Sequence, residues 1–436
     1  MVRLDAEHGL HALTSLIKGS SSSRDTVIQS VRLINASWLC VLAGVALSML
    51  GVASIDVAQN LSGGADLASE AWRQIVFVTI GMLAATVVAL PHYRVLGLLS
   101  WVGMAVVLGL LVFLLLPFVP ASIVTPRNGA RGWINLGFTD FQPAELAKIA
   151  YVLVVARYLR FRTQHRQFRG LIVPGLLTIP PAGLITLQPD LGTAILFVPS
   201  LAGMLIAAGA RLRHLVLILV LTVATAPLLY PLLQPHQKTR LIAMAQQVSG
   251  DRSSEQDINF QSFRAQTLIG AGQASGLGES QARAIVHYNR LPERHNDMIY
   301  AVIVARFGLV GGAAVIGLYL LWIAGALLVS ASCREPFGRI VCVGFAGFIT
   351  AQMIINIGMN VGLLPIIGIT LPFVSYGGSS MVTTWLMTGL IVNVALHRPR
   401  PPYRDSFEYA DDDEELFYAT RPYGRSAGFS GRALTR

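Results

Sequence analysis

The residues best suited to chemistry lie in one short segment, LPERHND, at positions 291–297. Asp297 can accept a proton as a general base, and Arg294 can hold phosphate oxygens in bidentate fashion. Glu293 and His295 add two more ionisable side chains to the same segment. The segment could therefore bind phosphate and move a proton; the alternative is an interfacial helix cap with a solvated charged face.

A second group of polar residues spans GARGWINLG at 129–137 and QPAELAK at 142–148, and it includes Arg131. Glu145 and Lys148 are spaced i,i+3, so they share one face of a helix. Ionisable groups at membrane depth usually face the interior of a helix bundle. The pair is either a structural ion pair or a device that positions a polar head group.

Two further motifs carry candidate residues at predicted turns. Asp190 lies in QPDLGT at 188–193, where it could act in a site or simply cap the following helix. The stretch NIGMNVGLLPIIGITLPFVSYGGSS at 356–380 contains Ser375 and Tyr376. Its prolines and glycines preclude a continuous helix, and such backbone at membrane depth is tolerated where protein buries it or where it lines a cavity. The alternative is a kinked loop between two helices.

The elements that carry these motifs must be membrane helices. The chain has 436 residues with a net charge of +10, of which 53% are hydrophobic and only 13% charged. Because a soluble chain usually carries about 25% charged residues, this composition excludes a soluble globular enzyme and a disordered protein. The positive charge does not require a nucleic-acid partner, because cytoplasmic loops of membrane proteins collect Lys and Arg.

Apolar runs predict an all-α, polytopic integral membrane protein with about ten transmembrane helices. A cytoplasmic N-terminal segment at 1–32 and a disordered cytoplasmic tail at 398–436 flank the membrane domain at 33–397. A long outer loop at about 234–306 separates helices seven and eight, and partial helices are expected in it at 258–271 and 295–306. The ten predicted spans are 33–54, 72–90, 95–118, 144–161, 171–187, 191–209, 213–233, 307–331, 340–362 and 377–396.

Basic residues indicate the orientation of these spans. The loop 157–170 carries five arginines, and the loops 210–213 and 332–339 carry two each, whereas 188–190 and 363–376 carry none. Since short cytoplasmic loops are enriched in Lys and Arg, both termini are predicted to be cytoplasmic and all four motifs to lie on the outer side. The three cysteines form no spacing that suggests a disulfide framework or a metal site.

These four motifs, in this order on one face, resemble the SEDS family (shape, elongation, division and sporulation) of cell-wall polymerases, which includes RodA and FtsW. The resemblance covers about residues 33–398. It implies a peptidoglycan glycosyltransferase that polymerises lipid II in cell elongation or division and releases undecaprenyl pyrophosphate. It places the protein in the bacterial inner membrane with the active face outside, beside a class B penicillin-binding protein.

The resemblance also assigns roles to residues. It implies that Asp297 is the catalytic aspartate, which takes the proton of the attacking hydroxyl. Family members are helped by a divalent cation, Mg or Mn, although no dedicated metal ligands are visible in this sequence. Substrate-binding residues are expected at Arg131, Glu145, Lys148, Asp190, Glu293, Arg294, His295, Ser375 and Tyr376, with Arg131, Lys148 and Arg294 offsetting the charge of the pyrophosphate.

The sequence departs from the family pattern at several positions. Ala144 and Asn296 replace a serine and a threonine, and Ala305 and Arg306 replace a Glu-Glu pair. These changes keep two alternatives open: a catalytically weakened scaffold for a penicillin-binding transpeptidase, and a lipid II flippase. Spans nine and ten carry no acidic or basic residue, which favours surface chemistry over translocation.

Overall fold

The structure is a computed structural model of the chain. It describes residues 35–60, 67–120, 122–127, 130–137, 139–161, 167–218 and 260–397, with single residues at 220, 238 and 242. The described residues between 35 and 397 all belong to one compact unit. The predicted N-terminal segment, most of the seventh span and the C-terminal tail lie outside the described residues.

Eight helices of the described part are long and apolar enough to cross a membrane. The chain is therefore an all-α, polytopic membrane protein, as the hydropathy predicts. Six of these spans are single helices: α2 (Ser37–Gln59), α3 (Ser69–Ala89), α4 (Tyr93–Leu115), α13 (Ile299–Ser332), α14 (Pro336–Val361) and α15 (Gly378–His397). The other two are interrupted: η2 (Phe168–Leu171) continues into α6 (Ile172–Leu187), and α7 (Leu191–Ile195) into α8 (Phe197–Ala208).

Helix α5 (Pro143–Arg160) is the predicted fourth span, and it carries more charge than the other eight. Pro143 occupies its first turn, where the missing N–H costs nothing. Glu145 lies in the first turn, and Arg157 and Arg160 in the last, so both ends suit the helix dipole. Most of its side chains are buried, so α5 forms part of the interior of the bundle.

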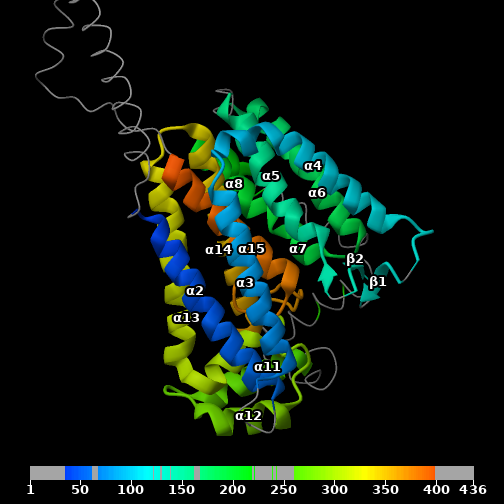
Figure 1. The fold of residues 1–436 in the computed structure, drawn as a ribbon, viewed down its shortest axis with the longest axis vertical. Helices are drawn as coiled ribbons and strands as arrows, with labels where there is room; N and C mark the ends of the chain where they lie inside the picture. The colour runs from blue at the N-terminus through cyan, green and yellow to red at the C-terminus, as the bar shows by residue number, and fades with distance from the viewer. Residues whose placement is uncertain are drawn as a thin grey trace, which may run out of the picture. The chain divides into compact units, whose positions relative to one another are not determined.

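The helices pack in a defined order around α14. Figure 1 shows α2, α3 and α13 together on one side of the bundle, with α4, α5 and α6 on the other. The most extensive contacts join α15 to α3, α13 to α2, and α14 to both α13 and α8. Helix α14 therefore lies between the two sides, and its polar residues can reach elements from both.

A three-stranded antiparallel sheet follows α4, in a region where the sequence predicted no strand. Its strands are β1 (Val124–Arg127), β2 (Ala130–Asn135) and β3 (Asp140–Phe141), in the order β1-β2-β3. Val124 faces Ile134 in the register, and Ile134 faces Phe141. Hydropathy did not predict these strands because it measures apolar content, whereas the sheet depends on cross-strand pairing.

The described part of the long outer loop is helical. Helix α11 (Phe260–Gly272) confirms the partial helix expected at 258–271, but α12 (Gly278–Asn289) was not expected. The partial helix expected at 295–306 is the first part of α13, which begins at Ile299. Helix α13 has a kink at Gly308 (φ 70°, ψ −170°). At this kink the connector between α11 and α12 supplies hydrogen bonds: Leu277 N donates to Ala305 O, and Leu309 N to Gln273 O.

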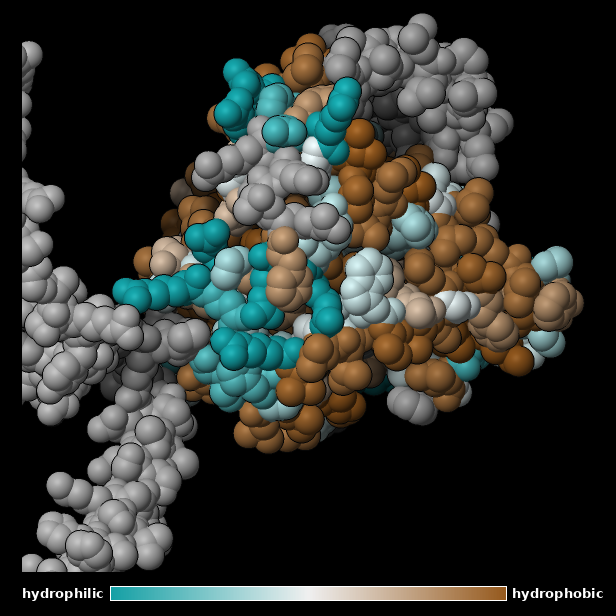
Figure 2. Space-filling view, turned by 90° about the horizontal axis from the view of Figure 1, so that it is seen from above, coloured by the Kyte–Doolittle hydropathy of each residue, from teal (hydrophilic) through white to brown (hydrophobic). Residues whose placement is uncertain are grey.

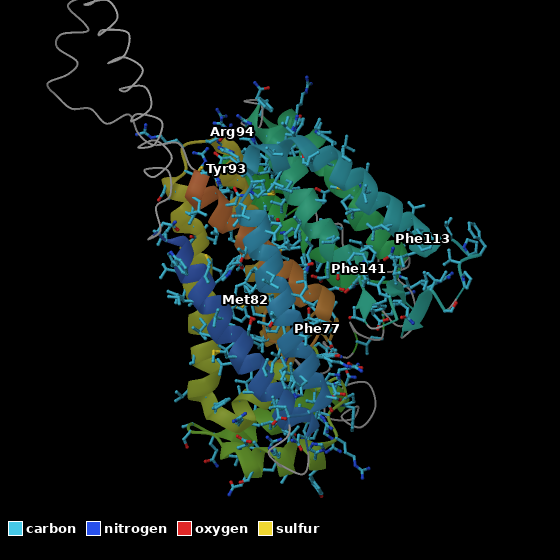
Figure 3. All side chains as sticks on the ribbon, in the orientation of Figure 1. Phe77, Met82, Tyr93, Arg94, Phe113 and Phe141 are labelled. Atoms are coloured by element: carbon cyan, nitrogen blue, oxygen red, sulfur yellow. The ribbon has the colours of Figure 1, made fainter. Side chains whose placement is uncertain are left out.

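The two ends of the bundle differ in composition. We call the end where α2 stops and α11 and α12 lie the Asp297 end, and the opposite end, where α4 begins, the Glu335 end. At the Glu335 end, Glu335 accepts hydrogen bonds from Tyr93 and Arg94 and pairs with Arg160. Figure 2 looks onto this end and shows hydrophilic side chains gathered between hydrophobic flanks, and Figure 3 labels Tyr93 and Arg94 there.

Candidate active site

Asp297 lies just before α13 and is largely buried, with 8% of its surface exposed. Its backbone carbonyl accepts hydrogen bonds from the side-chain amides of Asn356 (2.8 Å) and Asn360 (3.0 Å). Both asparagines are fully buried on α14. The carboxylate is therefore presented from a fixed backbone position rather than from a loose loop.

The two asparagines tie three elements together. Asn356 also donates to Ile369 O at 2.7 Å, which joins the start of α13 to the loop after α14. Asn360 Oδ1 accepts from Ala301 N at 3.2 Å, in the first turn of α13. Residues four apart share one helix face, so one face of α14 holds both the Asp297 segment and the loop.

The loop at 362–377 packs directly against the segment that bears Asp297. Ser375 Oγ donates to Asn296 O at 2.7 Å and accepts from Leu371 N at the same distance. Tyr376 N donates to His295 O at 2.9 Å, and the two rings lie 5.7 Å apart. The structure thus brings Ser375, Tyr376 and His295 together beside Asp297, from parts of the chain about 80 residues apart.

Gly368 brings the same loop close to the carboxylate. Its φ of +77° lies in the left-handed region that favours glycine. A Cβ built at this position would lie 3.8 Å from Asp297 Oδ2. A glycine here therefore provides both the backbone conformation and the space beside the carboxylate.

Gln74 of α3 holds the loop from the other side. Its Nε2 donates to Ser375 O at 2.9 Å, and its Oε1 accepts from Gly377 N at 3.3 Å. Phe77, one turn further along α3, lies 6.2 Å from the Tyr376 ring and is labelled in Figure 3. Gln74 is fully buried, so α3 positions the loop although most of its surface is exposed.

Glu293 and Arg294 shape the approach to Asp297. Glu293 adopts a left-handed backbone (φ +50°), and its carbonyl accepts from Asn296 N (3.0 Å) and Met298 N (3.2 Å). Its carboxylate also accepts from the Asn296 amide. Arg294 donates to Val286 O at 3.5 Å, so it contacts α12 rather than the loop at 362–377.

Burial lowers the pKa of two side chains here. The pKa of Arg294 falls below the usual value for arginine. Burial also lowers the pKa of His295 below 6.5, while Glu293 and Glu70 oppose this shift. His295 is therefore neutral at pH 7, and its imidazole can offer one donor and one acceptor.

Asp190 caps α7, as one of the two sequence alternatives predicted. Its Oδ1 accepts from Thr193 N at 2.9 Å. Its Oδ2 also accepts from the Gln142 side chain at 3.3 Å, and Gln142 N donates to Ser379 Oγ at 3.0 Å. These contacts connect the starts of α5, α7 and α15, next to the loop that bears Ser375.

Glu145 and Lys148 form a buried ion pair, with 2.8 Å between Lys148 Nζ and Glu145 Oε1. Lys148 exposes only 1% of its surface and also donates to Gln352 Oε1 of α14 at 3.4 Å. Glu145 Oε2 is buried without a hydrogen-bond partner among the described residues. The structural ion pair is thus observed, and a role toward a polar head group stays a prediction.

Arg131 does not join the residues around Asp297 in the described part of the chain. Its guanidinium donates to Leu116 O at 3.3 Å and to Val119 O at 2.9 Å. These contacts fasten β2 to the end of α4. A role for Arg131 in binding pyrophosphate would need guanidinium N–H groups that do not bind these two carbonyls. That role stays a prediction.

The sequence interpretation gave no role to three buried polar residues of the site. Gln74 was not singled out, whereas Asn356 and Asn360 lie in the fourth motif but were given no function. Their i,i+4 spacing on an otherwise apolar helix is a signal that could have predicted a shared role. Among the described residues, no group of three or more His, Cys, Asp or Glu side chains could hold a metal ion, and the expected divalent cation stays a prediction.

Comparison with known proteins agrees with this architecture. The family described as "Cell cycle protein", which groups FtsW, RodA and SpoVE, matches residues 35–400. The chain therefore belongs to the FtsW/RodA/SpoVE family.

Individual relatives cover most of the chain. It is 34% identical over 359 residues to the probable peptidoglycan glycosyltransferase FtsW of Thioalkalivibrio sulfidiphilus, which covers 81% of this chain and 86% of that protein. It is 31% identical over 332 residues to the peptidoglycan glycosyltransferase MrdB of Escherichia coli K12, covering 75% and 85%.

Solved structures share the fold. A structure described as "Structural coordination of polymerization and crosslinking by a peptidoglycan synthase complex" aligns with a TM-score of 0.68 and 29% identity, over 84% of this chain and 98% of that one. The crystal structure of Thermus thermophilus RodA aligns with a TM-score of 0.60 and 28% identity over the same shares.

Proposed function

We propose that this chain is a peptidoglycan glycosyltransferase that polymerises lipid II, with Asp297 as the general base. The observation that carries the assignment is the placement of Asp297. It is a largely buried carboxylate fixed through its own backbone by Asn356 and Asn360. The names of the relatives in this family support the same activity.

The reaction forms one glycosidic bond and breaks one bond to phosphate. The 4-hydroxyl of the acceptor's GlcNAc attacks the anomeric carbon of the donor's MurNAc, and undecaprenyl pyrophosphate leaves with the bonding electrons. The hydroxyl proton passes to the Asp297 carboxylate as the new bond forms. Since pyrophosphate is already a good leaving group, a strong general acid is not required.

The neighbours of Asp297 have distinct roles in this proposal. The loop with Ser375 and Tyr376 lies beside the carboxylate and forms one side of the site. Neutral His295 supplies a hydrogen bond to the substrate without adding charge. Arg294 and Lys148 are the cations proposed to offset charge on the pyrophosphate. A divalent cation, where the resemblance implies one, would be bound mainly through substrate phosphate oxygens.

The proposed location is the bacterial inner membrane, with the Asp297 end outside. The arginines of the short loops lie at the Glu335 end, where Arg94 and Arg160 contact Glu335, and the positive-inside rule makes that end cytoplasmic. A class B penicillin-binding protein is the proposed partner. The likeness to a chain from a peptidoglycan synthase complex supports this.

A flippase is the second candidate function, and one observation favours it. The Glu145–Lys148 pair is buried and joined to α14 through Gln352, and buried ionisable groups in membrane helices often belong to transport pathways. A scaffold without catalysis is the third candidate, motivated by the missing Glu-Glu pair at 305–306.

One paired assay separates these functions. Purified protein is mixed with lipid II and a transpeptidase partner, and glycan strands are separated by length; in parallel, labelled lipid II is followed across liposome bilayers. We expect strands to form without accelerated translocation. Translocation without strands would favour the flippase, and neither product would favour the scaffold.

A further inference from the structure

Four charged side chains form a network at the Asp297 end that the proposed chemistry does not use. The Arg283 guanidinium bridges Asp56 and Glu279, with 2.7 Å to Glu279 Oε1. Arg306 donates to Glu279 Oε2 at 2.6 Å. Asp56 lies near the end of α2, Glu279 and Arg283 lie on α12, and Arg306 lies on α13, so the network joins three elements.

Backbone carbonyls complete the network. Arg283 Nη1 donates to Asp56 O at 3.1 Å and to Asn60 O at 2.8 Å, at the end of α2. Arg306 Nη1 donates to Ala53 O at 2.8 Å, one turn before Asp56. Both arginines therefore bind the end of α2 directly, and Glu279 lies between them.

Burial makes the Asp56–Arg283 part of this network costly to break, whereas the Glu279 side chain is 52% exposed. The side chains of Arg283 and Asp56 are 7% and 9% exposed, and that of Arg306 is 16% exposed. Its two positive and two negative charges cancel, so it offers no surplus charge to a phosphate. Removing one member of such a set leaves an uncompensated buried charge. In agreement, the Arg283 hydrogen bond and the nearby Arg306 charge lower the pKa of Glu279.

The network fixes one end of the helical section that begins beside Asp297. This section runs from Ile299 to Phe307 and ends at the Gly308 kink. Asn356 and Asn360 hold its start. Arg306 holds its other end, where Leu277 N also donates to Ala305 O at 3.0 Å.

We propose that the Asp56–Arg283–Glu279–Arg306 network is a positioning device for Asp297, with Arg306 and Glu279 as its adjustable pair. The inference rests on the proposed polymerase function. Arg306 stands where the family resemblance leads one to expect an acid, and Glu279 supplies the opposite charge across from it. The charge reversal at position 306 is thus matched within this chain and does not mark a weakened catalyst.

The test changes the charges of this pair. Arg306→Glu places two acids side by side, and Arg306→Lys keeps the charge. The double variant Arg306→Gln/Glu279→Gln removes both charges but keeps a donor toward Ala53 O and an acceptor for Arg283. Arg94→Gln is the control, because it removes a salt bridge to Glu335 (3.2 Å) at the opposite end. Each full-length protein is assayed with lipid II for kcat and KM, and by hydrogen exchange over residues 291–307.

We expect Arg306→Glu to lower kcat by about tenfold or more, because a small misplacement of a catalytic group can cost about 100-fold. KM should change little and exchange over 291–307 should rise. The double variant Arg306→Gln/Glu279→Gln should keep most of kcat. Arg306→Lys and Arg94→Gln should keep kcat near that of the wild type.

Wild-type kcat in Arg306→Glu, or a lost kcat in the folded double variant, would overturn the inference. If Arg306→Glu does not fold, the double variant decides: a kcat near wild type supports the network, and a lost kcat in folded protein refutes it. A wild-type protein without polymerase activity would instead refute the proposed function itself.

Discussion

At the scale of single residues, the site depends on amides that hold a backbone rather than on charges that surround a carboxylate. Asn356 and Asn360 bind the carbonyl of Asp297, and Gln74 binds the loop that carries Ser375. Each amide lies inside an apolar helix, where an unmade hydrogen bond is costly. The position of Asp297 therefore depends on two helices, α14 directly and α3 through the loop.

Replacing Asn356 should therefore damage catalysis beyond its effect on stability. Asn356→Leu removes the donors to Asp297 O and Ile369 O, and lost buried hydrogen bonds cost about 1–3 kcal/mol. We expect a lower melting temperature and a loss of polymerisation per folded molecule. Thermal unfolding and a lipid II assay on the same preparation measure both.

Asn393 supplies a matched control for that substitution. It is also fully buried, and its amide donates to two carbonyls, those of Val88 and Pro91, near the Glu335 end. Asn393→Leu should lower stability similarly but leave the rate per folded molecule unchanged. Equal rate losses in the two variants would show that the amides stabilise the fold without positioning Asp297.

The motifs predicted much at this scale, but not everything. Asp297, His295, Ser375 and Tyr376 were all singled out from the sequence, and the structure places them together. Arg131, in contrast, binds carbonyls at the end of α4. The spacing of a motif shows which residue types are near each other along the chain, but not which backbone groups from other helices they meet.

At the scale of elements, the loop between α14 and α15 is the part that brings distant segments to the site. It contacts the Asp297 segment through Ser375 and Tyr376, and α3 through Gln74. Its glycines permit a path that other residues could not follow. Gly362 (φ +90°) ends α14, and Gly368 (φ +77°) lies beside Asp297.

A comparison of these two glycines tests the loop's role. Gly368→Ala and Gly362→Ala each force an alanine into a left-handed backbone, at a cost of about 1–2 kcal/mol. Only Gly368→Ala also adds a methyl group 3.8 Å from Asp297 Oδ2. We expect comparable losses of stability, with a much larger loss of lipid II polymerisation for Gly368→Ala; similar rates would argue against a loop wall beside the carboxylate.

The membrane helices could be predicted from the sequence, but the strands and the kink in α13 could not. Apolar runs identified all eight described spans, because a spanning helix must expose apolar side chains to lipid, and α5 was inferred at 144–161 despite its charged residues. The strands β1, β2 and β3 and the kink at Gly308 depend on hydrogen bonds between segments. No local property of the sequence reports such bonds.

At the scale of the whole molecule, charge divides the described unit into two unlike ends. Basic residues of the short loops lie at the Glu335 end, including Arg94, Arg160 and Arg334. At the Asp297 end, arginines are matched by acids, as in the pairs of Arg283 with Asp56 and Arg306 with Glu279. The net charge of +10 is therefore explained by the orientation of the protein in the membrane and not by binding of an acidic substrate.

Thiol labelling tests this orientation with little background. The three native cysteines are all buried. Tyr288 on α12 is 87% exposed at the Asp297 end, and Arg334 is exposed at the opposite end. A membrane-impermeant maleimide should label Tyr288→Cys in intact spheroplasts, but Arg334→Cys only after permeabilisation; the reverse pattern would place the site on the cytoplasmic side.

The carboxylate of Asp297 is the proposed acceptor of the hydroxyl proton. Asp297→Asn keeps the shape of the side chain and the backbone carbonyl that Asn356 and Asn360 bind, but it removes the proton acceptor. The decisive measurement is the rate of glycan strand formation from lipid II by this variant, in protein shown to be folded and bound to its partner. We predict a loss of about 100-fold or more, the scale of general-base catalysis. Polymerisation at the wild-type rate would contradict the assignment of Asp297 as the base.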